Sequence, residues 1–298
     1  LVAVMTSWTL ADIPWDRFDP VKVDRDLVPI VKAASMVEYN AGDYRQYLKR
    51  VFKGDEKVCR AIDGWSTEEV QHGRALAAWA RLADPGFDFD SSFRLFRESF
   101  RVPVDVDRSV RGSRSGEMVA RCMVETGTNS FYSALSDATD EPVLKEICRR
   151  IADDEYAHYC LFLAQMRRSL QIENLTVGQR LRIAFGRIAE AEDDELATAY
   201  WAANRPRESF DRRTNSVAYA RESLKYYRPG HIGRMVEMVF RAIGLDPSGP
   251  LGWLAARAAR LFIWYRSRFQ PRLAVLRFGL AARLASSGYG RRHTGTAG

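Results

Sequence analysis

The sequence predicts an all-α protein, and three observations lead to that prediction. Long stretches carry apolar residues at helical spacing. Breaks rich in proline, glycine and aspartate separate these stretches, as at residues 84–86 and 246–250. No segment has the alternation of apolar and polar residues that a half-buried strand requires. With 298 residues and 46% hydrophobic content, the chain is long enough for one large domain and too apolar to be disordered.

The expected elements follow in order along the chain. Residues 1–23 are expected to form an extended lead, because they include Pro14 and Pro20. The main helical domain is expected at 24–228. Its helices are predicted at 24–52, 56–83, 115–138, 142–170, 176–203 and 207–227, and another leads to Gly244. The phenylalanine-rich segment 84–112, with a short helix of its own, fits the crossover between two helical hairpins.

Two copies of one short pattern stand out, Glu69-Val70-Gln71-His72 and Glu155-Tyr156-Ala157-His158. On a helix, positions i and i+3 share a face, so each copy points a carboxylate and an imidazole at one spot. A lone glutamate precedes each copy at almost the same distance. Glu38 lies 31 positions before Glu69, and Glu125 lies 30 before Glu155. This spacing indicates two similar helical hairpins packed around one site.

A Glu from each of two helices and a Glu-x-x-His from each of the other two resembles the di-iron carboxylate site of ferritin-like bundles. Carboxylate and imidazole suit iron, and four carboxylates balance two Fe(II) ions. We therefore predict a ferritin-like four-helix bundle with additional C-terminal helices, which binds two iron ions and uses dioxygen. Manganese in one of the two positions stays open. The plain alternative is solvated helix-surface glutamates and two core histidines. The predicted metal ligands are Glu38, Glu69, His72, Glu125, Glu155 and His158.

Three further residues are predicted to support the ligands. Asp154 and Glu68 each stand beside a ligand glutamate, where each is expected to accept the outer N–H of the opposite pair's histidine. Thr128 follows Glu125 by three positions, so its hydroxyl is a candidate proton donor beside the metals. The alternative for Thr128 is an ordinary bond back to a helix carbonyl. The aromatic residues at 131, 132 and 162 are expected to line an apolar approach or to be plain core.

One stretch resembles a known family. Residues 65–73, Trp-Ser-Thr-Glu-Glu-Val-Gln-His-Gly, are similar to the Trp-Thr-x-Glu-Glu-x-x-His-Gly segment of soluble acyl-(acyl carrier protein) desaturases. Residues 154–158 resemble the second Asp-Glu-x-x-His segment of that family, and Glu125 with Thr128 resembles its lone Glu followed by Thr. The resemblance covers roughly residues 24–170. It implies the same six ligands and the oxygen-dependent removal of two hydrogens from an acyl chain. It also implies electrons from a ferredoxin-like donor and an acyl carrier protein or lipid as partner.

Two other functions stay open. The first is a di-iron hydroxylase or N-oxygenase of a smaller substrate. The second belongs to another class, iron binding and storage, although storage proteins are usually shorter bundles than this chain. A homodimer is expected in each case.

The positive charge of the protein is concentrated at the C-terminal end. The last acidic residue is Asp246, and nine arginines follow it. The net charge of the protein is +7, so the part of the chain before these arginines is slightly acidic. Residues 229–298 are therefore expected to form a basic amphipathic helical extension with a disordered end. Three interpretations of 250–285 stay open: peripheral contact with an anionic membrane, docking of an acidic partner, or packing on the bundle with a solvated basic face. No nucleic-acid motif accompanies the arginines.

Cysteine usage and the first residues of the sequence bear on the compartment. Four cysteines lie within helical patterns and form no Cys-x-x-Cys, which is typical of reduced core thiols. The stretch 1–15 has no basic segment of the kind that opens a signal peptide. A cytoplasmic protein, with peripheral contact at the inner membrane face, is therefore expected.

Overall fold

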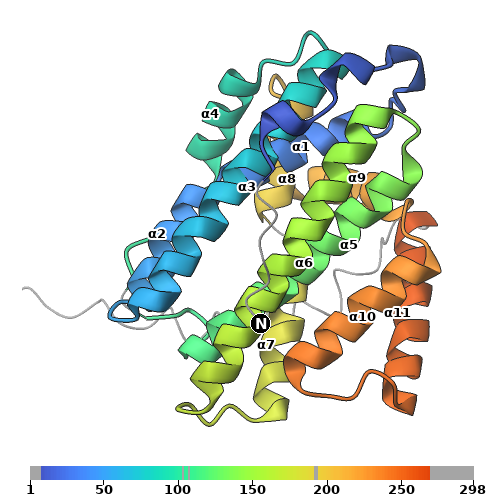
Figure 1. Ribbon diagram of the computed structural model, residues 1–298. Coiled ribbons are helices and arrows are strands. Elements are labelled where there is room, and N and C mark those ends of the chain that lie inside the picture. The colour runs from blue at the N-terminus through green and yellow to red at the C-terminus, as the bar shows by residue number, and fades with distance from the viewer. Residues whose placement is uncertain (1–7, 103, 107, 191–193, 269–298) are drawn as a thin grey trace, which may run out of the picture.

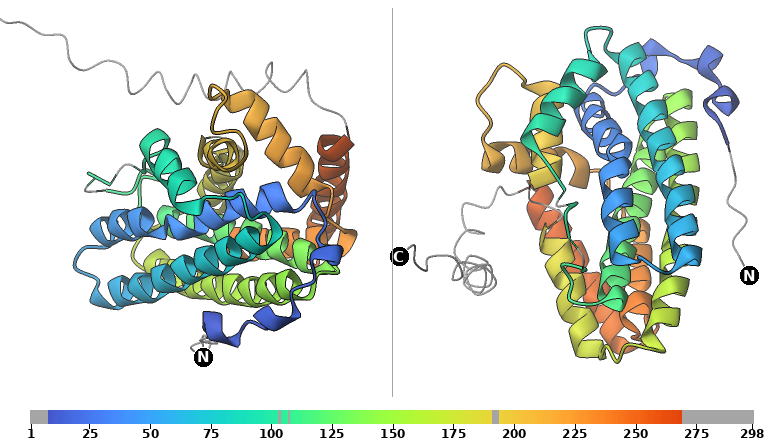
Figure 2. Two further views of the ribbon diagram at one scale, coloured as in Figure 1. Left: turned by 90° about the horizontal axis from the view of Figure 1, so that it is seen from above. Right: turned by 90° about the vertical axis from the view of Figure 1, so that its left-hand side faces the viewer.

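In the computed structural model, the part of the chain that is described comprises residues 8–102, 104–106, 108–190 and 194–268. Within these ranges the regular elements are all helices, which confirms the all-α prediction (Figure 1). Four of them lie side by side as a bundle (Figures 1 and 2). They are α1 (Val28–Tyr39), α3 (Glu56–Ala83), α5 (Arg114–Ala138) and α6 (Pro142–Leu170). Helix α3 packs against both α1 and α6, and α5 packs along α6.

The long helices begin at side chains that cap them. Asp55 accepts a hydrogen bond from the third backbone N–H of α3, and Ser113 does the same for α5. Helix α6 begins after Glu141, which accepts from two backbone N–H groups, with Pro142 in the first turn. Helix α3 runs through Gly64 without a break. The three predicted ranges are therefore confirmed to within a residue or so.

The predicted first helix, 24–52, is divided in two. It begins at Val28 and ends at Tyr39, and α2 (Ala41–Val51) follows after Asn40. The backbone N–H of Asn40 is shared among the carbonyls of residues 36, 37 and 38, and its side-chain Oδ1 accepts from Arg97 at 2.8 Å. An asparagine that bonds elsewhere is a poor helix-interior residue, which accounts for the break.

The remaining helices cover the bundle. Helix α4 (Phe89–Ser99) lies in the predicted crossover. The prediction for 176–203 corresponds to α7 (Val177–Glu190) and α8 (Asp194–Asn204), on either side of residues 191–193. Then follow α9 (Arg212–Leu224), α10 (Pro229–Ile243) and α11 (Pro250–Arg268). Helix α8 packs on α1, while α7 and α10 pack on α5. The predicted continuation of the basic helices beyond residue 268 lies outside the described residues.

The lead lies along the outside of the bundle and contains three short 3-10 helices. They are η1 (Leu10–Asp12), η2 (Trp15–Arg17) and η3 (Pro20–Lys22). Helix η1 touches α3, and η2 touches α6. The lead was predicted to be extended, but these three short helices interrupt it. These contacts hold Trp8, which is buried, against the bundle.

A buried polar layer separates two apolar clusters inside the bundle. One cluster contains Trp79, Leu135 and Ile147, and the other contains Trp65 and Phe162. Along α3, α5 and α6, the polar residues at 69–72, 125–129 and 154–158 fall between the two clusters. The second cluster also includes residues of α10, so the core extends past the boundary predicted at residue 228. No helix in the described part of the chain is long and apolar enough to cross a membrane.

Candidate metal centre

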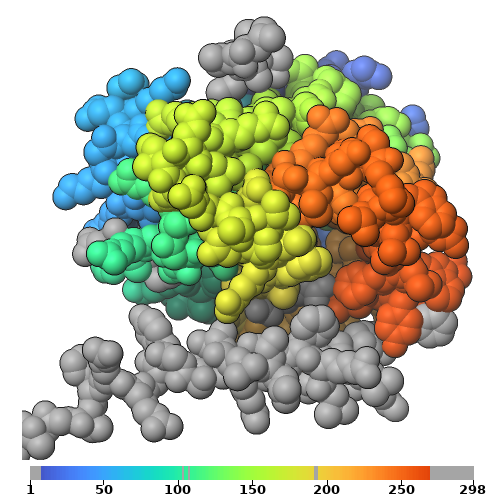
Figure 3. Space-filling model, turned by 90° about the horizontal axis from the view of Figure 1, so that it is seen from below, coloured from blue at the N-terminus to red at the C-terminus, as the bar shows by residue number. Residues whose placement is uncertain are grey.

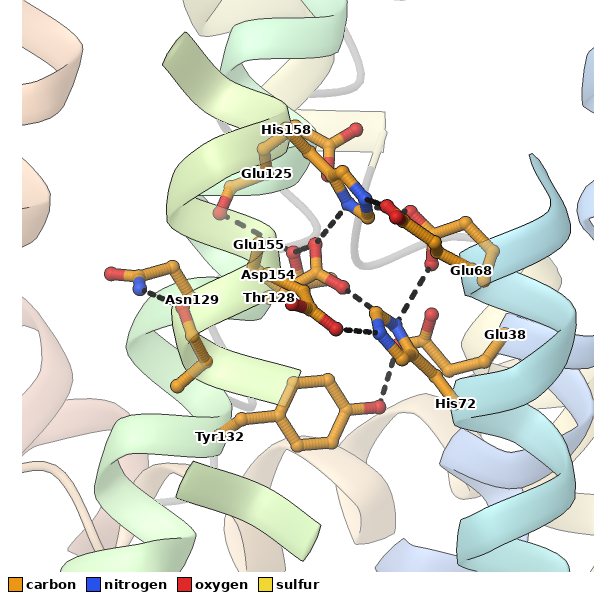
Figure 4. A network of polar contacts seen from close by, with 12 residues as sticks. Glu38, Glu68, His72, Glu125, Thr128, Asn129, Tyr132, Asp154, Glu155 and His158 are labelled. Carbon is orange, nitrogen blue, oxygen red and sulfur yellow. Dashed lines mark hydrogen bonds and ion pairs between the residues drawn. The ribbon is translucent and has the colours of Figure 1, made fainter. Parts of the chain in front are cut away.

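All six predicted ligand residues come together in the buried polar layer. Figure 4 labels all of them except Glu69. Each is at most 6% exposed. Glu38 comes from the end of α1, Glu69 and His72 from α3, Glu125 from α5, and Glu155 and His158 from α6. Four helices therefore each contribute side chains to one site, as the spacing in the sequence predicts.

The six residues form two groups that could each hold a metal ion. One group is Glu38, Glu69, His72 and Glu155, and the other is Glu69, Glu125, Glu155 and His158. Within each group the ligand atoms all lie within 4.8 Å of one another. Glu69 and Glu155 belong to both groups. Two ions bound there would share the two central carboxylates, and each histidine and each outer glutamate would serve one ion.

The histidines point one ring nitrogen into the site and the other away from it. Nδ1 of His72 lies 3.2 Å from Glu155 Oε1 and 3.6 Å from Glu69 Oε2. Nδ1 of His158 lies 3.3 Å from Glu69 Oε1. On the outer side, Nε2 of His72 is 3.0 Å from Asp154 Oδ2, and Nε2 of His158 is 2.7 Å from Glu68 Oε2.

These outer contacts are the crossed pairs predicted from the sequence. Helix α6 supplies the acceptor for the histidine of α3, and α3 supplies the acceptor for the histidine of α6. A carboxylate at Nε2 favours the tautomer that carries its proton there, which leaves the lone pair of Nδ1 directed at the site.

Several buried polar atoms at the centre have no hydrogen-bond partner among the described residues. They are Nδ1 of His72, Nδ1 of His158, Oε2 of Glu125 and Oε1 of Glu155. Buried polar atoms are nearly always paired, so four unpaired atoms directed at one space call for a ligand. Each is a donor atom that iron or another transition metal accepts. The residues present therefore fit a pair of metal ions.

The electrostatics of the site divide the carboxylates into two kinds. Burial raises the pKa of Glu38 well above its usual range, and the neighbouring carboxylate of Glu69 adds to the shift. Burial also raises the pKa of Glu125, although Arg121 opposes it. Against burial, the neighbouring Glu38 and the two histidines hold the pKa of Glu69 well below its usual range. The outer glutamates thus hold protons more readily than the shared ones.

The histidines also favour protonation when no metal is bound. Burial acts against the charged form, yet the surrounding carboxylates raise the pKa of His72 and of His158 well above the usual range. A divalent ion would displace these protons, because the metal takes over the neutralisation of the carboxylates.

The Thr128 hydroxyl contacts both a ligand carboxylate and helix carbonyl oxygens, the two alternatives predicted for it. Its hydroxyl lies 2.6 Å from Glu155 Oε2, to which it can donate. It also lies 3.2 Å from the carbonyl oxygen of Val124 and 3.3 Å from that of Glu125. The hydroxyl therefore touches a shared ligand directly, beside the space between the two groups.

Two aromatic residues make contacts with the site that were not predicted, although Tyr132 was expected to line an approach to it or to be plain core. Trp8 Nε1 donates to Asp154 Oδ2 at 2.6 Å, and the Trp8 ring lies parallel to His72 with centroids 5.9 Å apart. Nothing in the sequence signals this contact across 146 positions. Tyr132 donates its O–H to Glu38 Oε1 at 2.5 Å. A signal existed for Tyr132, because it stands seven positions, two helical turns, after Glu125.

A charged residue was also missed. Arg121 precedes Glu125 by four positions and donates to its Oε1 at 2.6 Å. Its guanidinium lies 4.5 Å from the centre of the Trp65 ring. The i, i+4 spacing of an arginine and a predicted ligand could have revealed this pair from the sequence.

A small cavity of about 50 Å³ lies beside the carboxylates. One part of its wall is the ligand cluster with Thr128. The rest of the wall is formed by Val37, Ala41, Tyr44, Trp65, Arg121, Val124, Arg187 and Glu195. The space next to the site is therefore lined by charged and polar groups as well as apolar ones.

Comparison with known protein families and with curated proteins finds no match for this chain.

Proposed function

We propose that this chain is a ferritin-like dinuclear iron oxidoreductase that uses dioxygen to oxidise an organic substrate. The observation that carries the proposal is the pair of ligand groups sharing Glu69 and Glu155. Shared carboxylates suit two ions held close together, and this set of ligands is that of the di-iron sites in ferritin-like bundles.

Each iron position would have its own histidine and its own outer glutamate. His72 and Glu38 would hold one ion, and His158 and Glu125 the other, with Glu69 and Glu155 between them. When bound, the iron pair supplies the electrons for the reduction of dioxygen. Manganese in one position is compatible with the same hard ligands.

The other residues of the site prepare it for this chemistry. Asp154 and Glu68 accept from Nε2 of the histidines, which fixes the ring orientation and directs Nδ1 at the position where a metal would bind. The Thr128 hydroxyl contacts Glu155 Oε2 and lines the cavity. It is positioned to hold a proton at the boundary between the ligands and a substrate.

The reaction has two candidate outcomes. Desaturation removes two hydrogens from a fatty acyl or lipid-like chain, and both oxygen atoms leave as water. Hydroxylation or N-oxygenation places one oxygen atom on a smaller substrate, and the other leaves as water. In either case two electrons and two protons come from outside, so a one-electron donor such as a ferredoxin is required.

Different observations favour the two substrates. The resemblance of residues 65–73 and 154–158 to acyl carrier protein desaturases favours an acyl chain, with an acyl carrier protein or a lipid as partner. The cavity favours the smaller substrate, because its volume is small and two arginines and a glutamate line it. Iron storage would need the ligand set alone, without a substrate cavity. A homodimer remains our expectation for the assembly.

Metal stoichiometry tests the central observation. Anaerobic iron(II) titration of the protein should give two ions per chain. Glu155→Ala removes a shared ligand and should abolish binding of both ions, whereas Glu38→Ala should weaken one. The matched control is Glu56→Ala, since Glu56 is an exposed residue of the same helix as Glu69. Equal stoichiometry in all three variants would contradict the assignment of the ligands.

Dioxygen consumption by the iron(II)-loaded protein then distinguishes the functions. Acceleration by a long-chain acyl carrier thioester would favour desaturation, and acceleration by a small substrate would favour the oxygenase. Uptake that no organic compound accelerates, with ferric iron accumulating beyond two ions per chain, would favour storage.

A further inference from the structure

A buried arginine beside the ligand cluster has a hydrogen-bond donor without an acceptor. Arg121 is 6% exposed, and its Nε has no hydrogen-bond partner among the described residues. The rings of Trp65 and Phe162 lie 4.5 and 5.3 Å from the guanidinium carbon and hold the side chain in place. A buried guanidinium with an unused N–H requires an acceptor, and the cavity is the space it lines.

A second arginine lines the same cavity from another helix. Arg187 lies on α7, and its charge acts on both Tyr44 and Glu195 across the cavity. The Tyr44 hydroxyl donates to Glu195 Oε2 at 2.6 Å, which leaves Glu195 Oε1 without a hydrogen-bond partner among the described residues. The charged groups in the wall outside the ligand cluster are thus two cations and one carboxylate.

The charges indicate the sign of the missing group. Two divalent ions would balance the four ligand glutamates. The other charged residues that line the cavity are Arg121, Arg187 and Glu195. Together they carry a net charge of one positive unit. In a site of low dielectric constant such a surplus favours a monoanion, and guanidinium groups match the geometry of a carboxylate.

We propose that Arg121 and Arg187 form a binding subsite for the carboxylate of a small organic anion. The oxidisable carbon or nitrogen of that molecule would face Thr128 and the shared glutamates. A volume of about 50 Å³ accommodates only a few water-sized groups, at about 10–15 Å³ for each. The inference rests on the proposed function and specifies its substrate class as a small monocarboxylate.

Calorimetric titration of the anaerobic iron(II)-loaded protein tests this subsite. The probes are propionate and its neutral isostere propionamide. Propionate should bind, and propionamide should bind at least tenfold more weakly, because it lacks the charge that the arginines recognise. Arg187→Gln should weaken propionate binding at least tenfold. The matched control is Arg182→Gln, since Arg182 is exposed on the same helix.

Three outcomes would overturn the subsite. They are no binding of propionate, equal binding of propionate and propionamide, and propionate binding that Arg187→Gln leaves unchanged. The last would assign the carboxylate to the metals alone. Iron content is measured on the same samples. Two ions per chain without propionate binding would reject only the subsite, whereas no iron binding would reject the proposed function.

A separate observation concerns the outer surface of α11, which lies at the edge of the face in Figure 3. Only Gly252 and Ile263 of this helix are buried, where it packs against α9 and α10. Seven large apolar or aromatic side chains of the helix are exposed by 40–65%. They are Leu251, Trp253, Leu254, Leu261, Phe262, Trp264 and Tyr265. The outer face therefore carries large apolar side chains as well as basic ones.

Arginines accompany these apolar side chains. The guanidinium of Arg257 lies 4.9 Å from the centre of the Trp253 ring, and that of Arg268 lies 5.4 Å from Trp264. Arg260 is also exposed, and no acidic residue follows Asp246 in the sequence. If a second copy of α11 covered this surface, arginines would face arginines and repel one another. The same holds for the arginine-rich sequence after residue 268. An anionic lipid surface instead complements both the charge and the aromatic side chains.

We infer that α11 lies on the surface of an anionic lipid bilayer, parallel to the membrane plane. Sedimentation of the full chain with phosphatidylglycerol-containing vesicles should be strong, and with pure phosphatidylcholine vesicles weak. The double variant Trp253→Ser, Leu261→Ser should reduce the bound fraction at least tenfold. Ile172→Ser is the control, since Ile172 is an exposed apolar residue elsewhere on the molecule. Failure to sediment, or a concentration-dependent dimer that the double variant abolishes, would overturn the inference.

Discussion

A Cβ atom at Gly73 would lie 2.5 Å from the backbone nitrogen of Tyr39, far inside van der Waals contact. Only glycine therefore lets α3 approach α1 this closely. Gly73 follows the ligand His72, and Tyr39 follows the ligand Glu38. The contact thus determines how near the carboxylate of α1 comes to the side chains of α3.

Gly73→Ala is expected to separate α1 from α3 and to destabilise the protein by at least about 2 kcal/mol, since backbone atoms cannot yield as a side chain can. Iron bound at the position that Glu38 serves should be lost first. Urea unfolding and iron titration measure the two effects. Gly64→Ala is the control on the same helix, because open space surrounds Gly64. It should stabilise the protein by about 0.5–1 kcal/mol.

Asp154→Ala is expected to weaken metal binding about 10–100-fold, because His72 loses the acceptor that orients it. Competition with a chelator of known affinity measures the change. The adjacent Asp153→Ala is the control, since Asp153 is exposed and pairs only with Arg149 among the described residues. Equal affinity in both variants would contradict the orienting role of Asp154.

Thr128→Val is expected to leave iron content unchanged and to slow substrate-dependent dioxygen consumption about tenfold or more, because the hydroxyl that contacts Glu155 is lost. Thr126→Val is the matched control on α5, since among the described residues the Thr126 hydroxyl bonds only to the carbonyl of Cys122. If the two variants behave alike, the Thr128 hydroxyl serves the helix and not the reaction.

The stability of the metal-free protein is expected to fall as pH rises through the neutral range. The raised pKa values of His72 and His158 mean that the folded state binds protons that the unfolded state has released. Glu38 and Glu125, whose pKa values are also raised, act in the same direction above the unfolded value of about 4.3. Thermal unfolding at about pH 6 and 8 measures the slope. Metal loading should remove most of it, because the ions replace the protons.

Metal binding itself should release protons and strengthen as pH rises over the same range. Titration of iron(II) into weakly buffered protein, followed with a pH indicator, measures the release. Binding without proton release would contradict the protonation of the histidines in the metal-free site.

The ligand residues could be found from the sequence because each pattern is local. Glu69 and His72 share a helix face by virtue of their spacing alone, and the same holds for Glu155 and His158. The crossed contacts of Asp154 and Glu68 then followed from their positions next to the ligands. Helix ends were predictable where a capping side chain or a proline marked them, as at Glu141 and Pro142.

Other features depend on contacts that no local pattern encodes. Trp8 reaches Asp154 from a lead whose path along the bundle is set by tertiary packing. Arg187 meets the cavity because α7 packs on α5, which the sequence of α7 alone does not specify. The break at Asn40 was missed because no proline marks it in the sequence, whereas the backbone at Asn40 leaves the helical conformation.

The polar layer between the two apolar clusters has a consequence for how the protein opens. Without metal, the layer contains buried polar atoms that have no hydrogen-bond partner among the described residues, so we expect the bundle to be weakest at mid-height and not at its ends. Amide hydrogens near residues 69–73, 125–129 and 154–158 should then exchange with solvent through partial opening, although they lie in the middle of long helices. Bound iron would suppress this partial opening. The exchange protection of amides in the centre of the protein would therefore measure how much metal is bound.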